Sequence, residues 1–65
     1  MKSILIMGTI ITKKTAKDWL VEFARNMYRE GTLESIYLLS DVENKLIKNC
    51  LICVEEIEEL EIMAM

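Results

Sequence analysis

An amphipathic segment over residues 16–30 constrains this chain more than any other feature. Its apolar residues recur every three or four positions, which is the spacing of one face of an α-helix. Thr15 and Asp18 form a Thr-x-x-Asp start, in which the threonine hydroxyl is expected to accept a hydrogen bond from a free backbone N–H group. Gly31 follows the segment, as glycine commonly follows the last turn of a helix. We therefore predict a helix with this apolar face: Ala16, Trp19, Leu20, Phe23, Ala24, Met27 and Tyr28.

Two shorter apolar runs flank this helix. Residues 3–11 are apolar on both faces of an alternating pattern, which is typical of a strand covered on both sides. Gly8 lies within this run, and glycine in a strand often marks a bulge or the close approach of another backbone. Residues 33–39 fit a buried strand or a helical turn equally well, and we interpret them as a strand. If the two strands pair in parallel, they form a βαβ unit with a right-handed crossover.

The last third of the chain is apolar on one side when it is treated as a helix. Over residues 41–61, only Ile52 and Glu61 clearly lie on the wrong side of that helix. Treated as a strand, residues 45–54 have two faces of mixed polarity. We therefore predict a long helix over residues 41–61.

A capping box at Ser40 and Glu43 supports the start of this long helix. The alternative is a hairpin that turns at residues 41–44. The complete prediction is one small α+β domain over residues 1–65, in the order strand, helix, strand and long helix. The alternative order is strand, helix and β-hairpin with a short C-terminal element. Two strands make a thin sheet, so a dimer that extends the sheet or pairs the long helices would cover exposed surface.

The size of the chain also favours association. A chain of 65 residues buries only about 60% of the surface that its unfolded form exposes, so additional stabilisation is expected. Two cysteines cannot form a disulfide framework, and the chain has no histidine, which is the commonest metal ligand and general base. The serines therefore lack a histidine that would activate them. We expect a homodimer with no enzymatic activity and no cofactor.

Charge divides the chain into two halves. Residues 1–32 carry six basic and three acidic side chains, giving +3, and residues 33–65 carry two basic and eight acidic side chains, giving −6. Either the two halves pack on each other within one chain, or the basic half of one chain pairs with the acidic half of another, as two-fold symmetry permits.

The two cysteines, Cys50 and Cys53, have the Cys-x-x-Cys spacing of redox and zinc sites. Structural zinc needs four ligands, and one chain supplies two thiols. A redox thiol needs an exposed, electropositive position, whereas Cys50 is expected near the middle of a helix, upstream of Glu55 and Glu56. We therefore predict that both cysteines pack in the core, and we rank a metal or redox protein last among the functions.

The acidic run over residues 55–61 and the apolar tail after it are the features to which we assign function. The run is either a solvated face or a surface that binds a basic partner, and an apolar tail is expected to pack on something. Our leading hypothesis is a protein-interaction module that binds a larger protein through this helix and tail. The interface residues are predicted to be Leu46, Cys50, Cys53, Ile57, Leu60, Met63 and Met65. The acidic partner surface is predicted to be Glu55, Glu56, Glu58, Glu59 and Glu61.

The second hypothesis is a regulator or inhibitor of nucleic-acid machinery, acting by DNA contact or by imitating phosphates with the acidic run. The net charge of −3 argues against direct contact, and a helix-turn-helix over residues 19–48 would have a nearly neutral recognition helix. Lys13, Lys14 and Lys17 lie at the start of the first helix without the glycines of phosphate-binding loops.

The start of the chain resembles a secretion signal only in part. A charge precedes an apolar run, but Thr12 and two lysines follow where a small-residue cleavage site is expected. The run is also shorter than the roughly 20 apolar residues that a membrane-spanning helix needs. We therefore expect no membrane partner and a cytoplasmic protein whose thiols stay reduced.

Overall fold

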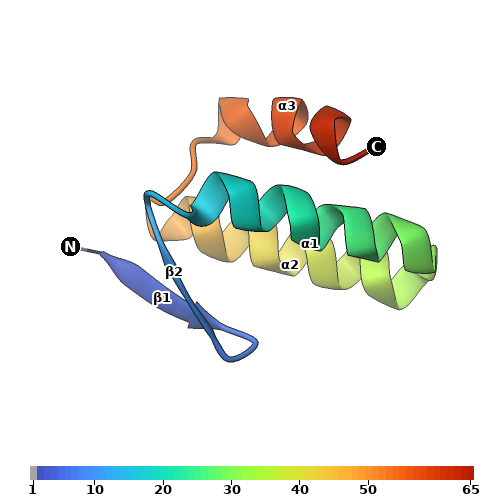
Figure 1. Cartoon of the computed structure of the whole chain (residues 1–65), viewed down its shortest axis with the longest axis horizontal. Helices are drawn as coiled ribbons and strands as arrows, with labels where there is room; N and C mark the ends of the chain where they lie inside the picture. The colour runs from blue at the N-terminus through green and yellow to red at the C-terminus, as the bar shows by residue number, and fades with distance from the viewer. Residues whose placement is uncertain (1) are drawn as a thin grey trace.

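The computed structural model describes residues 2–65 as a β-hairpin followed by three helices (Figure 1). The predicted α+β class is confirmed, but neither predicted order of elements is correct. α1 contacts α2, α3 and β2, so it is the central element. In chain order the elements are β1 (Ser3–Ile6), β2 (Thr9–Thr12), α1 (Ala16–Glu30), α2 (Leu33–Lys48) and α3 (Val54–Ala64).

The hairpin replaces the single strand predicted over residues 3–11. That prediction is wrong because the chain reverses at Met7 and Gly8, which have φ angles of 51° and 80°. A two-residue turn with two positive φ angles matches the twist of the antiparallel strands it joins. The resulting register places Leu5 opposite Ile10. Because side chains alternate along a strand, the turn decides which residues share each face of the hairpin.

The helix predicted over residues 16–30 is confirmed as α1. Gly31 ends it with a φ of 66°, and the Gly31 N–H donates to the Met27 carbonyl at 3.1 Å. The prediction for the start is wrong, because the Thr15 hydroxyl caps no N–H group of the helix. It accepts a hydrogen bond from the Thr12 N–H at 3.1 Å instead, which ties the helix to the end of β2.

The strand predicted over residues 33–39 is wrong, because these residues begin α2. Thr32 caps this helix, since its hydroxyl accepts a hydrogen bond from the Ser35 N–H at 3.1 Å. The Ser35 hydroxyl in turn donates to Oε2 of Glu30 at 2.7 Å. A two-residue connection with these bonds returns the chain along α1 as a second helix, so α1 is not the crossover of a βαβ unit.

The long helix predicted over residues 41–61 is also wrong, because the chain leaves the helix after Lys48 and begins α3 at Val54. The predicted capping box is wrong too, since Ser40 lies inside α2 and Glu43 is buried. The alternative, a hairpin turning within this segment, is wrong because the segment is helical.

A Schellman motif ends α2. The Leu51 N–H donates to the Leu46 carbonyl at 2.9 Å, and the Cys50 N–H donates to the Ile47 carbonyl at 3.0 Å. Cys50 takes the left-handed conformation, with a φ of 58°, at the position where glycine is usual. Leu46 and Leu51 are both buried, which is the hydrophobic pairing that commonly accompanies this motif.

One hydrophobic core joins the hairpin to the helices. Trp19 and Tyr28, which were predicted to face the core, are half-buried against it. Within residues 2–65, the helices are too short or too polar to cross a bilayer. The core consists of Ile6, Ile11, Ala16, Leu20, Val21, Phe23, Ala24, Met27, Leu39, Val42, Leu46, Leu51, Ile52, Leu60 and Ala64.

Candidate functional site

The residues predicted to form an interface divide between the core and the surface. Leu46 and Leu60 lie inside the core of the chain itself, where they are 0% and 6% exposed. Ile57 is half-buried against that core. Met63 and Met65, at the end of α3, are 61% and 85% exposed. The methionine tail is therefore accessible to a partner, whereas the leucines already pack within this chain.

The prediction that Cys50 and Cys53 pack in the core is wrong, because both are exposed. Cys50 follows the last turn of α2 and Cys53 precedes the first turn of α3, while Leu51 and Ile52 between them are buried. Both thiols therefore meet the condition that a reactive cysteine be exposed. In the part of the chain that the structure describes, however, these thiols join no group of three or more residues that could hold a metal ion.

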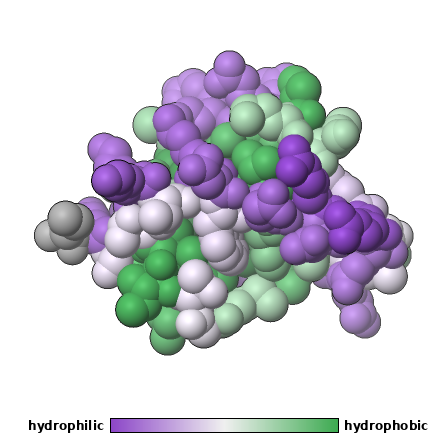
Figure 2. All heavy atoms as spheres, in the orientation of Figure 1, coloured by the Kyte–Doolittle hydropathy of each residue, from purple (hydrophilic) through white to green (hydrophobic). Residues whose placement is uncertain are grey.

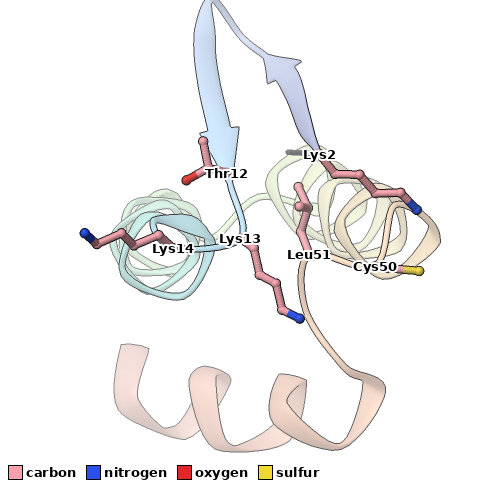
Figure 3. A pocket seen from close by; sticks show the side chains of 6 residues that line it. All are labelled: Lys2, Thr12, Lys13, Lys14, Cys50 and Leu51. Atoms are coloured by element: carbon pink, nitrogen blue, oxygen red, sulfur yellow. The ribbon is translucent and has the colours of Figure 1, made fainter.

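An open cavity of about 790 Å³ lies beside Cys50, between the open end of the hairpin and the connection from α2 to α3. Three lysines line it together with Thr12, Cys50 and Leu51. In Figure 3, Lys14 points away from Lys2 and Lys13, so the three ammonium groups do not converge on one point. A binding pocket for an anion needs convergent polar groups, and we therefore assign no ligand to this cavity.

The glutamates predicted to form one acidic surface point in different directions. Glu61 is half-buried and lies close to Glu43 of α2 and Tyr28 of α1. Glu56 is also half-buried and pairs with Lys17. The glutamates that stay exposed are Glu55, Glu58 and Glu59. The accessible acidic surface is therefore smaller than predicted and contains three carboxylates.

Glu56 connects the two oppositely charged halves of the chain. Its Oε2 atom forms an ion pair with Lys17 of α1, and its Oε1 atom accepts a hydrogen bond from the Cys53 N–H at 3.0 Å. The hydrogen bond from Lys17, followed by that from the Cys53 backbone, holds the pKa of Glu56 below its usual value. The same ion pair raises the pKa of Lys17. The positive and negative halves therefore contact each other within one chain.

The hairpin has one covered and one uncovered face. Ile6 and Ile11 are buried on the covered face, at 4% and 1% exposure. Leu5 and Ile10 are opposite each other on the uncovered face, and each is 68% exposed. Met7 in the turn is 67% exposed. Figure 2 shows the corresponding apolar surface over the hairpin.

Sequence reasoning missed this apolar surface because it placed residues 3–11 in one strand covered on both sides. The Met7-Gly8 pair was the available signal, since a two-residue loop ending in glycine between apolar runs is a hairpin signature. Asparagine or aspartate usually occupies the position of Met7, so the signal is weak.

Comparison with known proteins adds no relative, since no family model, no curated protein and no solved structure matches this chain.

Proposed function

We propose that this chain is a non-enzymatic protein-interaction module that forms a homodimer and binds a larger protein through the outer face of α3 and its methionine tail. We place the module in the cytoplasm, where its exposed thiols stay reduced. The outer face of α3 is defined by Glu55, Glu58, Glu59, Ile62 and Met63.

The proposal rests on α3, which has one side packed on the core and one side exposed. Its inner side packs on the core through Ile57, Leu60 and Ala64. Its outer face combines three exposed carboxylates with Ile62 and Met63, which are 65% and 61% exposed. Those carboxylates form no ion pair with residues 2–65 in the structure. A surface of this kind is complementary to a protein that has basic residues around an apolar patch.

The uncovered face of the hairpin supports the homodimer. Leu5 and Ile10 leave apolar surface exposed on that face, and an exposed apolar patch of this kind marks a site of protein interaction. A second copy of the chain offers the same apolar face, and a two-fold axis would bring Leu5 and Ile10 of both copies together. Dimerisation through the hairpin leaves the outer face of α3 available for the partner protein.

Binding to a basic probe tests the surface on α3. The probe is a synthetic helical peptide of lysine and leucine, and affinity is measured by calorimetry at two salt concentrations. Replacing Glu55, Glu58 and Glu59 together with glutamine should weaken binding about tenfold or more, since each exposed charge pair contributes up to about 1 kcal/mol. It should also reduce the salt dependence of binding.

A matched variant separates this effect from the loss of net charge. Asp18, Glu34 and Asp41 are exposed on α1 and α2, and their replacement with the corresponding amides also removes three negative charges. This control should bind the probe nearly as well as the natural chain does. Equal losses in the two triple variants would show that binding depends on net charge, and would contradict a defined surface on α3.

The alternative function, inhibition of nucleic-acid machinery by phosphate mimicry, would use the same three carboxylates. It predicts that duplex DNA competes with this chain for its partner protein, whereas the interaction module predicts that DNA does not compete.

A further inference from the structure

The carboxyl group of Glu43 is buried, and one of its oxygen atoms lacks a hydrogen-bond partner among the described residues. Glu43 lies on α2 and is 9% exposed. Its Oε2 atom is buried and forms no hydrogen bond with the described residues. Burying a charged carboxylate without a partner is strongly unfavourable, so a group in this position is expected to be neutral or to find a partner.

The groups that face Glu43 come from two other helices. Glu61 approaches from α3, and Tyr28 of α1 lies close to both carboxylates. Within residues 2–65, no lysine or arginine forms an ion pair with either glutamate. The cluster therefore consists of three acidic groups without a cation, and two neighbouring carboxylates in such a place cannot both ionise easily.

The titration of the cluster agrees with this geometry. Burial first, and the negative charge of Glu61 second, raise the pKa of Glu43 from its usual 4.5 to about 7. Burial and then the two carboxylates also raise the pKa of Tyr28, so the phenol stays protonated at neutral pH. The proton that neutralises this cluster is therefore lost near neutral pH.

We propose that Glu43 of α2 and Glu61 of α3 hold one proton between them, and that loss of this proton loosens the docking of α3. A carboxylic acid on one side can donate a hydrogen bond to the carboxylate on the other, which joins the two helices. After deprotonation, two negative charges face each other beside the buried carboxyl of Glu43, and the simplest relief is for α3 to move away with Glu61.

α3 is the helix expected to move when the proton is lost. It has 11 residues, and isolated helices of this length are marginal in water, so α3 depends on its docking. Two other polar contacts hold it to α1, namely the Lys17 to Glu56 ion pair and a hydrogen bond from Nη2 of Arg25 to the Met63 carbonyl at 3.4 Å. Neither contact supplies a positive charge to the buried pair.

The direction of the pH effect follows from the raised pKa. The stabilisation is fully present below about pH 4.5, where Glu43 is protonated in the folded and unfolded chain alike. It decreases as the pH rises through about 7, because the folded chain must then lose a proton that the unfolded chain lost at lower pH. Docking of α3 should therefore weaken between mildly acidic and mildly alkaline conditions.

This inference goes beyond the proposed function, because it concerns the fold of the chain and holds whether or not α3 binds a partner. It adds a regulatory consequence if that function is correct, since the outer face of α3 would then be ordered in a pH-dependent way.

Amide hydrogen exchange of the full chain tests the proposal, with the opening constants of α3 compared at about pH 5.5 and about pH 8.5, on either side of the titration. After correction for the intrinsic pH dependence of exchange, opening of α3 should increase at least tenfold at the higher pH, which corresponds to one unit of pKa difference. The opening of α1 should change much less.

Two variants give the test its controls. Glu43→Gln replaces the carboxyl by a neutral group of the same shape and should remove most of the pH dependence of α3. Glu59→Gln changes an exposed carboxylate of α3 itself and should preserve the pH dependence of α3. A natural chain whose α3 opens equally at both pH values, or a Glu43→Gln variant that keeps the full dependence, would overturn the proposal.

A second readout separates the proposal from changes in folding or assembly. In a carbon NMR titration of the side-chain carboxyl groups, Glu43 should show a transition near pH 7. Glu61→Gln should move the transition of Glu43 to lower pH, because it removes the neighbouring charge. A transition of Glu43 near its usual 4.5 would contradict the shared proton. The solution mass of each sample shows independently whether the chain is a dimer.

Discussion

Ile10 and Ile11 are adjacent residues of one chemical type, and they face opposite sides of the hairpin. Ile11 is 1% exposed in the core, whereas Ile10 is 68% exposed next to Leu5. The helices therefore complete the hydrophobic packing of the hairpin on one side and leave the other side open. Within one chain, only one face of the hairpin is buried. The other face is the surface where a second copy would bury apolar area.

The largest expected effect comes from the covered face. Ile11→Ala should lower the free energy of unfolding by about 2 to 4 kcal/mol, because it removes buried methyl groups and leaves a cavity. The same change at the neighbouring position, Ile10→Ala, should alter it by less than about 0.5 kcal/mol in dilute protein. Urea denaturation measures both. Similar losses of unfolding free energy at the two positions would contradict the burial of one face of the hairpin and the exposure of the other.

An intermediate effect is expected at the turn that sets the two faces. Gly8→Ala should lower the free energy of unfolding by about 1 kcal/mol, because Gly8 has a φ of 80° that a residue with a Cβ atom rarely adopts. Free space surrounds the added methyl group, so steric contact is not the cause.

Met7→Asn is the matched change at the other position of the turn. It should raise stability, since asparagine tolerates a positive φ better than methionine. Thermal denaturation of the two variants checks both signs. A stable Gly8→Ala variant would indicate that this turn does not determine the register.

The smallest effect on folding is expected on the uncovered face. Leu5→Lys should change the stability of the dilute chain by less than about 0.5 kcal/mol, because the side chain is already 68% exposed. Denaturation at low protein concentration measures this change. A large loss would mean that Leu5 contributes to the core of the single chain.

Two helix ends show how far this fold was predictable from sequence. Both α1 and α2 end with a residue in the left-handed conformation, Gly31 and Cys50. The end of α1 was predicted because glycine is the usual residue there. The end of α2 was missed because cysteine gives no such signal, and the backbone at Cys50 is held instead by the hydrogen bonds and burial around Leu46 and Leu51.

A weaker signal for this break was present in Ile52, which lay on the wrong side of the predicted long helix. The structure explains the mismatch, since Ile52 belongs to the loop between α2 and α3 and is buried from there. The same error placed the cysteines in the core. Exposure of Glu55 follows from the sequence pattern, whereas the position of Glu61 beside Glu43 depends on how α3 packs on α1, which no local pattern specifies.

The solution mass of the full chain tests the central claim most directly. Sedimentation equilibrium over a range of concentrations should give twice the mass of one chain for the natural protein, and the mass of one chain for Leu5→Lys. Leu33→Lys is the matched control, because Leu33 is 74% exposed on α2 and away from the hairpin, and this variant should remain a dimer. A natural chain that stays monomeric at every concentration, or a Leu5→Lys variant that still dimerises, would contradict the proposal that the uncovered face of the hairpin joins two copies.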